Sequence, residues 1–263
     1  FFKSYKLNSF IISKNKNIYN YFLIIMFFSM FLLESFDFIS FFITLESSTF
    51  IIITLLFLQN YSNSSKEAGF KYFFIHGLSS SCFILTILIF IYIFKTTNYL
   101  TLLYYFLFSN VFFKLYVNYI FLNFLIYISL TSLFFFIFFK FSIFPCHFWI
   151  TSFYEGAPLI TLIFFTTIFK LFVLNFFLKI FFFLIIKIKT FIYSLILFSI
   201  VYGAHLAFIQ KKIKRYWAYS TVNNFGFFFF STFFCNYFWG LQLGLFFILI
   251  YLFMTFFFFF FFF

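Results

Sequence analysis

Three charged residues lie inside long apolar stretches of this chain, where charges are rare. Glu46 lies in the middle of one stretch, Lys140 late in a second, and Lys170 near the centre of a third. A charge at the centre of a membrane helix costs about 2.5 to 3.5 kcal/mol on translocon-based scales. Roughly 15 Å of helix separates Lys170 from either end of its stretch, so its amine cannot reach an interface.

These residue types suit proton transfer. Burial disfavours the charged form of a carboxylate and of an ammonium group, whereas pairing the two restores both charged forms. A lysine whose carboxylate partner moves nearer or farther can therefore take up and release a proton near neutral pH. The sequence predicts that Glu46, Lys140 and Lys170 handle protons or other ions, and the alternative is a snorkelling or structurally paired charge.

Pro145 follows Lys140 closely and predicts a discontinuous helix at this point. A proline at membrane depth breaks the helical ladder and is tolerated where the freed backbone lines protein or water. His76 and His205 also lie in apolar stretches, and each is either a proton relay or a packed, hydrogen-bonded side chain. The histidines and cysteines show no spacing typical of haem, zinc or disulfide sites, so no metal or cofactor is expected in this chain.

The composition indicates the medium in which these residues lie. The chain of 263 residues is 66% hydrophobic and 8% charged, whereas an ordinary soluble domain is about 25% charged. Several continuous apolar stretches reach the length of about 20 residues that a helix needs to cross a bilayer, and the alternating segments of a membrane barrel are absent. The sequence therefore predicts an all-α integral membrane protein. The 65 phenylalanines are attributed to an A+T-rich genome, which is an organellar hint.

About eight transmembrane helices are expected in a single domain, residues 18–263, after a polar surface arm at residues 1–17. The expected spans are residues 18–33, 38–58, 70–94, 120–144, 159–180, 190–209, 216–234 and 241–262. Residues 99–119 are apolar but interrupted by Asn and Lys, and form either an amphipathic surface segment or a loop packed on the bundle. Loops are expected at residues 59–67 and 145–158.

The formal charge of +12 is explained by the placement of Lys and Arg in loops on one side of the membrane. With eight spans, most Lys and Arg residues fall on the side of the N-terminal arm, which also holds the loops 59–67, 145–158 and 210–215. The positive-inside rule then places the N-terminus on the cytoplasmic side or, in an organelle, the matrix side. Phospholipids such as cardiolipin, and no nucleic acid, are the partners that this charge suggests.

Four segments resemble one family in the same order. KFSIFPCHFWITSFYEGAP, at residues 140–158, is similar to the signature of the antiporter-like subunits of proton-pumping NADH:quinone oxidoreductase, in which a helix Lys precedes a Pro-x-His-x-Trp segment and Tyr-Glu-Gly-Ala-Pro. EAGFKYFFIHGLSSS from Glu67, GAHLAFIQKKIKRYWAYSTVNNFGF from Gly203, and ESFDFISFFITLE ending at Glu46 resemble three further family segments. EAGFKYFF together with IYLFMT favours the subunit 2 branch over subunits 4 and 5.

The resemblance implies an antiporter-like bundle with part of an inverted repeat. It implies a Glu46–Lys140 charge pair that gates protonation, and Lys170 as the next proton carrier. The chain would be a proton-translocating membrane-arm subunit of respiratory complex I, NADH:ubiquinone reductase, in the mitochondrial inner membrane, bound to other membrane-arm subunits. FMN, iron–sulfur clusters and ubiquinone would lie in those other subunits, and this chain would do no redox chemistry itself.

The sequence also departs from the family. Thr151 and Ser152 stand where the family usually has a Pro-Asp pair, which implies a less rigid and less acidic loop. The family has three helices before the position of Ile18, which shortened versions of the subunit lack. It continues beyond the position of Phe263 with another broken helix that carries a further Lys, so either the sequence is truncated or a second polypeptide supplies this part, and the second polypeptide is favoured. Two other readings stay open: a component of a multi-subunit cation/proton antiporter, and a scaffold subunit with an inactive proton path.

Overall fold

The computed structural model describes residues 23, 24, 27, 30, 31, 34–59, 63–102, 104–105, 119–185, 189–234 and 237–262. This part of the chain is helical, without strands, as the sequence predicts. Its principal elements are α2 (Phe38–Gln59), α3 (Asn63–Phe94), α5 (Tyr119–Phe141), α6 (Phe148–Gly156), α7 (Leu159–Phe164), the π-helical segment η2 (Phe165–Phe169), α8 (Lys170–Ile185), α9 (Lys189–Ile209), α10 (Ile213–Phe234) and α11 (Tyr237–Phe262).

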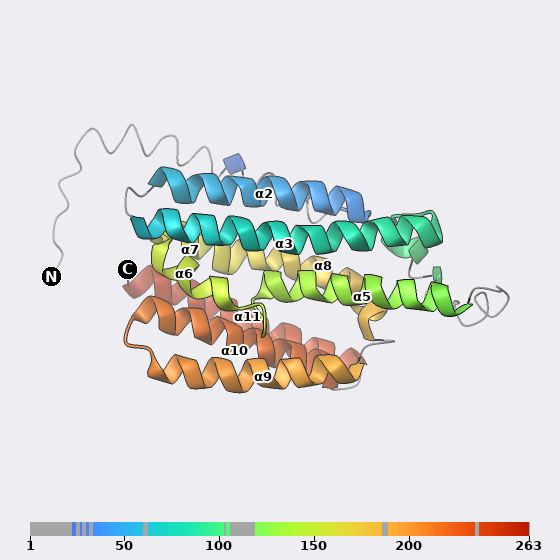
Figure 1. Cartoon of the computed structure of the whole chain (residues 1–263). Helices are drawn as coiled ribbons and strands as arrows, with labels where there is room; N and C mark the ends of the chain where they lie inside the picture. The colour runs from blue at the N-terminus through green and yellow to red at the C-terminus, as the bar shows by residue number, and fades with distance from the viewer. Residues whose placement is uncertain are drawn as a thin grey trace.

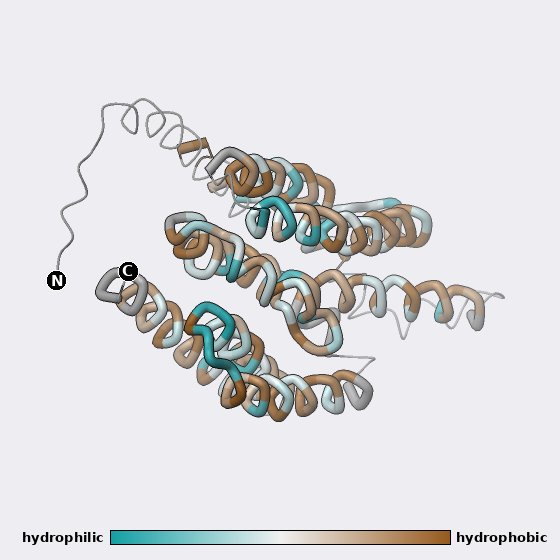
Figure 2. The backbone as a smooth tube through the Cα atoms, turned by 60° about the vertical axis from the view of Figure 1, so that its left-hand side comes forward, coloured by the Kyte–Doolittle hydropathy of each residue, from teal (hydrophilic) through white to brown (hydrophobic). Residues whose placement is uncertain are grey.

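The helices form a bundle in which most axes run alongside one another. The α2–α3 pair lies at one edge and the α9–α10 pair at the other, with α5 to α8 between them (Figure 1). The tube in Figure 2 is hydrophobic over most of its length, and its hydrophilic turns gather at helix ends, most clearly between α9 and α10. This is the distribution expected of helices that cross a bilayer.

Within the described residues, six helical stretches are long and apolar enough to cross a membrane, and they match six of the expected spans. They are Phe38–Phe57, Asn63–Phe94, Phe121–Phe141, Thr161–Ile180, Ile192–Ile209 and Trp239–Phe257. The expected span 216–234 forms α10, which carries Lys, Arg and Asn side chains and is less apolar than the other six. Most of the expected span 18–33, and the arm at residues 1–17, lie outside the described residues.

Two expected loops are partly helical. The loop expected at residues 59–67 is wrong from Asn63 onward, because α3 begins there and an i,i+4 ion pair joins Glu67 to Lys71 at 2.5 Å. The loop expected at residues 145–158 contains α6, packed between α3 and α10. Of the ambiguous segment 99–119, the described residues 99–102 and 104–105 are helical, and most of the rest lies outside the described part.

Aromatic contacts fill the interior between α2, α3, α5 and α8. The ring of Phe176 stacks on Phe41 with a centroid distance of 3.7 Å, and Phe83 stacks on Phe136 at 4.4 Å. Phe83 also meets Phe176 edge-on at 5.5 Å. Edge-to-face pairs such as Phe83 with Phe176 contribute roughly 0.5–1.5 kcal/mol each beyond the area that they bury. The phenylalanine excess therefore produces an interlocked aromatic core on this side of the bundle.

Small residues allow α9, α10 and α11 to approach one another closely. A Cβ atom added to Gly226 would lie 2.6 Å from Ser199 Oγ, and one added to Gly203 would lie 2.9 Å from the backbone nitrogen of Asn223. Gly244 of α11 faces Ser231 of α10 at a similarly short distance. Glycine at such contacts is typical of membrane helices, where close backbone approach replaces the hydrophobic driving force available in water.

We expect Gly226→Leu to separate α9 from α10 and to destabilise the protein by roughly 1–3 kcal/mol, as overpacking usually does. Gly77→Leu is the matched control, because no atom lies within 4 Å of a Cβ added at Gly77 and both changes remove a helical glycine. Thermal unfolding of the two variants in detergent measures the difference. Equal unfolding midpoints would show that the α9–α10 contact is not as tight as the structure has it.

Candidate functional site

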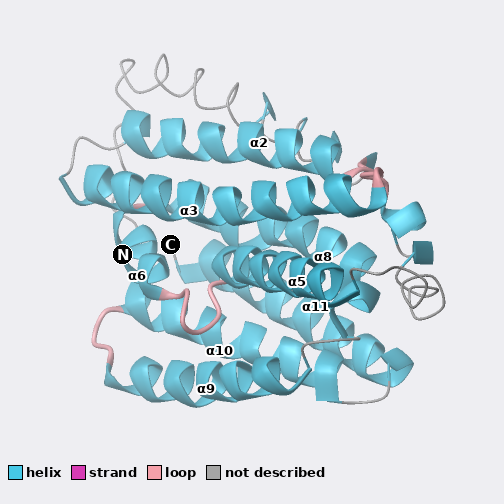
Figure 3. Ribbon diagram, turned by 45° about the vertical axis from the view of Figure 1, so that its right-hand side comes forward, coloured by secondary structure: helices cyan, strands magenta, loops and turns pink. Residues whose placement is uncertain are grey.

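The break between α5 and α6 positions Lys140. The helix α5 ends at Phe141, and α6 begins at Phe148, so residues 142–147 form a loop inside the bundle (Figure 3). Ser142 has a positive φ of 57°, a left-handed conformation that commonly ends a helix, and Pro145 has no amide proton to continue the ladder. The discontinuous helix predicted near Pro145 is confirmed, and Lys140 lies in the last turn before it.

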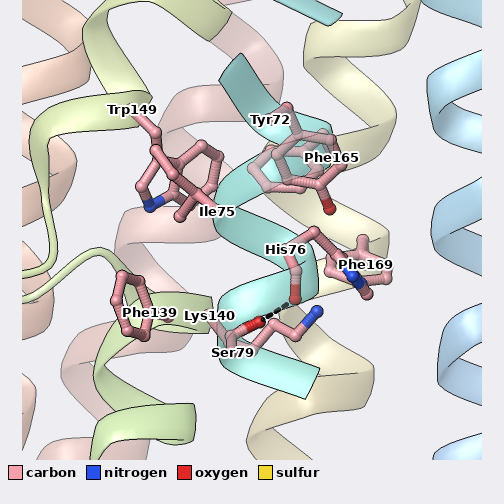
Figure 4. Close-up of a pocket in the computed structure, with 9 residues that line it drawn as sticks. All are labelled: Tyr72, Ile75, His76, Ser79, Phe139, Lys140, Trp149, Phe165 and Phe169. Atoms are coloured by element: carbon pink, nitrogen blue, oxygen red, sulfur yellow. Dashed lines mark hydrogen bonds between the residues drawn. The ribbon is translucent and has the colours of Figure 1, made fainter. Parts of the chain in front are cut away.

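The Lys140 side chain lies in the interior of the bundle, with only 5% of the residue exposed. Its Nζ lies 5.7 Å from the ring centroid of Phe136 and has no hydrogen-bond partner among the described residues. It borders a small cavity, shown in Figure 4, of about 10 Å³, on the order of one water molecule. The cavity is lined by Tyr72, Ile75, His76, Ser79, Phe139, Lys140, Trp149, Phe165 and Phe169.

Other polar atoms in the cavity wall are also buried without a described hydrogen-bond partner. They are the Tyr72 hydroxyl, Nε2 of His76 and Nε1 of Trp149. Most buried polar atoms in proteins are hydrogen-bonded to protein or to ordered water. A set of such atoms converging on one cavity is therefore suited to holding internal water beside the Lys140 amine.

Glu46 and His76 approach each other from α2 and α3. The Oε1 atom of Glu46 lies 3.6 Å from Nδ1 of His76, and the carboxylate also interacts with the Ser80 hydroxyl. Lys140 is near enough to interact electrostatically with both Glu46 and His76. Glu46, His76 and Lys140, all singled out in the sequence, are thus brought together. His76 lies beside the Glu46 carboxylate and also lines the Lys140 cavity.

Lys170 directly follows a π-helical turn. The segment η2 (Phe165–Phe169) interrupts the helix, and the hydroxyls of Thr166 and Thr167 both donate to the carbonyl of Ile163, at 3.2 and 2.7 Å. Single π-helical turns occur often at functional sites. Only 2% of Lys170 is exposed, and its Nζ lies 4.3 Å from the ring centroid of Phe225, with no hydrogen-bond partner among the described residues.

Four phenylalanines connect the surroundings of the two lysines. Phe165 and Phe169 of η2 line the Lys140 cavity, and Lys170 is the next residue after Phe169. The ring of Phe225, over which the Lys170 amine lies, is 4.9 Å from the ring of Phe141, the neighbour of Lys140. Lys140 and Lys170 therefore belong to one continuous interior region.

The structure does not bring His205 to this region, because its side chain is exposed on the outer face of α9. Of the two roles that the sequence allows for His205, a relay or a packed side chain, neither is supported by this exposed position. Within the described residues, no group of three or more His, Cys, Asp or Glu side chains could hold a metal ion.

A cluster of ion pairs at one end of the bundle was not anticipated. Both carboxylate oxygens of Glu155 meet the Arg215 guanidinium, at 2.7 and 2.8 Å, and Lys212 lies 3.0 Å from Oε1. Lys214 donates to the carbonyl of Ala157 at 3.0 Å. These contacts join the end of α6 to the start of α10, whereas the membrane side on which the segments 145–158 and 210–215 lie stays a prediction. The sequence held a signal for this cluster, because Glu155 and the basic residues at 211–215 both lie in segments that resemble the family.

The comparisons with known proteins agree on one family. The family model for the transmembrane part of NADH:quinone oxidoreductase and Mrp antiporter subunits matches residues 35–263. The chain is 31% identical over 225 residues to NADH-quinone oxidoreductase subunit N of Buchnera aphidicola subsp. Schizaphis graminum, covering 81% of this chain and 43% of that protein. It is also 31% identical over 202 residues to subunit N 1 of Thermodesulfovibrio yellowstonii, covering 75% and 41%.

Solved structures show the same fold at lower identity. A chain of respiratory complex I from Thermus thermophilus superposes with a TM-score of 0.62 at 20% identity, covering 78% of this chain and 42% of that one. A chain of the Mrp complex from Dietzia sp. gives 0.65 at 15% identity, covering 77% and 21%. The chain spans less than half the length of these relatives.

The Glu155 cluster should make the stability of the protein depend on pH in the acidic range. Hydrogen bonding to Arg215 holds the pKa of the Glu155 carboxyl below its ordinary 4.5. Its contribution, about 0.5–1 kcal/mol for a partly exposed pair, is therefore complete above pH 4.5 and lost as the pH falls through the lowered pKa. We expect Glu155→Gln to lower the unfolding midpoint at pH 7 and to flatten its fall below pH 4.5.

Glu67→Gln is the control for this experiment, because its ion pair with Lys71 is exposed and lies within one helix. Thermal unfolding in detergent at several pH values gives the comparison. If the two variants behave alike, the Glu155 cluster does not hold α6 to α10.

Proposed function

Because the chain belongs to the transmembrane family of NADH:quinone oxidoreductase and Mrp antiporter subunits, we propose that it is a proton-translocating membrane-arm subunit of respiratory complex I. The two relatives at 31% identity are both NADH-quinone oxidoreductase subunits of type N, the counterpart of the subunit 2 branch expected from the sequence. The observation that carries the proton function is the burial of Lys140 and Lys170, both without a described hydrogen-bond partner, in one interior region.

In the proposed mechanism, Glu46 controls the proton on Lys140. A nearby carboxylate favours the ammonium form of a buried lysine, and moving it away favours the neutral amine. His76 lies 3.6 Å from the carboxylate and lines the Lys140 cavity, so it can pass a proton between them or weaken their interaction as it changes its own protonation. A conformational change elsewhere in the complex that moves Glu46 of α2 away from Lys140 of α5 would then release the Lys140 proton.

Lys170 is the proposed acceptor of that proton. Internal water would connect the two amines around the rings of Phe165 and Phe169, which line the cavity on the Lys170 side. The π-helical turn supports this role, because an extra residue in the turn leaves backbone carbonyls without their usual partners and rotates the lysine that follows. The relay role of His76 stays a prediction, as do the roles of Glu46 and of both lysines.

The chain's place in the complex is part of the proposal. Other membrane-arm subunits and phospholipids such as cardiolipin would surround it, and FMN, iron–sulfur clusters and ubiquinone would lie in other subunits. The relatives above are bacterial, and the mitochondrial inner membrane, with the N-terminus on the matrix side, is proposed from composition and loop charge.

A multi-subunit cation/proton antiporter is the second candidate, because the matched family includes Mrp subunits and the Dietzia chain shares the fold. Sodium-dependent proton exchange by membranes that contain this chain, without coupling to NADH oxidation, would identify that function. NADH-driven proton pumping that is independent of sodium would identify the first.

We expect Lys170→Met to lower NADH-driven proton pumping by roughly tenfold or more, the scale on which a positioned proton-transfer group contributes, while the complex still assembles. Lys179→Met is the matched control on the same helix, since Lys179 donates to the carbonyl of Ser35 at 2.6 Å and is not placed in the proton path. Proton release per electron in membrane vesicles is the measurement. An intact proton-to-electron ratio in Lys170→Met would leave the scaffold reading as the better one.

We expect Glu46→Gln and Lys140→Met to be strongly non-additive. If the carboxylate acts through the Lys140 amine, the double variant should pump no worse than Lys140→Met alone, because the target of the carboxylate is already gone. Rates of proton pumping in the two single variants and the double variant complete the cycle. Additive losses would mean that Glu46 and Lys140 act independently.

A further inference from the structure

Three buried hydroxyl groups that the proposed mechanism does not use lie close together. They come from Tyr154 of α6, Thr221 of α10 and Tyr251 of α11, and at most 7% of any of these residues is exposed. The Tyr154 and Tyr251 hydroxyls lie near enough for the ionisation of one to affect the other, and the Tyr154 hydroxyl lies near that of Thr221. Neither tyrosine hydroxyl has a geometrically complete hydrogen bond among the described residues.

The hydroxyl cluster of Tyr154, Thr221 and Tyr251 lies next to Lys170. The ring of Phe225 separates them: the Lys170 amine lies 4.3 Å from its centroid, and the Tyr251 ring lies 6.0 Å from it. Thr221 and Phe225 are four residues apart on α10 and therefore share one face, about one turn from each other. The cluster is thus displaced from Lys170 by about one helical turn.

The displacement is toward the Glu155–Arg215 end of the bundle. Tyr154 directly precedes Glu155, whose carboxylate binds Arg215, and Thr221 lies six residues, or about 9 Å of helix, from Arg215. Along α10, Thr221 therefore lies between Arg215 and Phe225, the residue whose ring the Lys170 amine contacts.

Packing alone does not require tyrosine at these two positions. The chain has 65 Phe and 19 Tyr, so its composition supplies phenylalanine readily wherever only a ring is needed. Burying a hydroxyl without a complete hydrogen bond costs roughly 1–3 kcal/mol on mutational scales. The two phenolic oxygens therefore lower the stability of the protein. A role other than packing would explain why they are present.

We propose that the hydroxyl cluster is a proton-transfer branch that connects Lys170 to the Glu155–Arg215 end of the bundle. A hydroxyl can accept a proton on its oxygen while it donates its own. A proton arriving from the Glu155 side protonates the first oxygen, the original hydroxyl proton moves inward through bridging water, and the neutral Lys170 amine becomes ammonium. Each hydroxyl ends unchanged, and one proton has moved. This inference rests on the proposed function.

The test removes single oxygen atoms in the intact membrane complex. We expect Tyr154→Phe and Tyr251→Phe to slow NADH-driven proton pumping by about 3- to 10-fold, less than the loss of a positioned acid or base because water replaces a hydroxyl in part. The solvent deuterium isotope effect on pumping should rise in both variants, since proton transfer then limits the rate. Tyr193→Phe is the control, because the Tyr193 hydroxyl donates to the carbonyl of Phe233, away from the cluster.

The outcomes separate this inference from the proposed function. If Lys170→Met lowers pumping but the tyrosine variants match Tyr193→Phe, the hydroxyl branch is wrong and the proposed function stands. If Lys170→Met has no effect, the proposed function fails. A loss of pumping without a changed isotope effect means that the tyrosines are structural, and this too overturns the branch.

Thr221→Val covers the case in which a tyrosine variant does not assemble. It removes the remaining hydroxyl of the cluster while it conserves side-chain shape. Slower pumping with a raised isotope effect in Thr221→Val would support the branch, and pumping equal to that of Tyr193→Phe would overturn it.

Discussion

Two lysine amines without a described hydrogen-bond partner, held in the interior of an apolar bundle, are the constraint to which the rest of this structure responds. Each amine must be kept from lipid, because an ammonium group in hydrocarbon is costly. Lys140 and Lys170 both face inward, and each lies beside an aromatic ring. The backbone departs from regular α-helix next to each of them, at the loop 142–147 and at the π-helical segment Phe165–Phe169.

The two sides of the bundle are held together differently, and the lysines lie where these sides meet. Interlocked rings such as Phe41 and Phe176 pack α2, α3, α5 and α8, whereas glycines such as Gly226 bring α9, α10 and α11 together. Across the seam between them, Phe141 meets Phe225 at 4.9 Å and Phe177 meets Phe229 at 4.8 Å. Side-chain rings can change rotamer without a backbone movement, so a seam of rings is compatible with the gated path of the proposed function.

The sequence predicts the parts of this arrangement that depend on composition and depth. The apolar stretches predict the spans, and Lys170 stands out because no interface is within its reach. The start of α3 at Asn63 was missed, because Asn, Ser and Lys are typical of loops, and the packing of α3 against α6 and the Glu67–Lys71 ion pair are not evident from residue type. The π-helical turn was missed as well, since an i→i+5 pattern in FTTIF leaves no periodic signal.

The contacts between helices could not be predicted from the sequence. Helices that are hydrophobic on all sides carry no stripe that shows which face meets which neighbour, so nothing indicated that His76 would lie between Glu46 and the Lys140 cavity. The motif KFSIFPCHFWITSFYEGAP gave the break at Pro145 but not the ion pair of Glu155 with Arg215. Trp149 and Tyr72 were missed for the same reason, because each acquires a possible role only through the cavity that it lines.

The short helix α6 links these features. One of its ends follows the loop after Lys140, and the other is tied by Glu155 to Arg215 at the start of α10. Between these ends it carries Trp149, on the Lys140 cavity, and Tyr154, in the hydroxyl cluster beside Lys170. A shift of α10 at its charged end would therefore be transmitted by a rigid two-turn segment to the surroundings of both lysines at once. In the proposed function, where both lysines carry protons, surroundings that change together would keep the path from opening to both sides of the membrane at once.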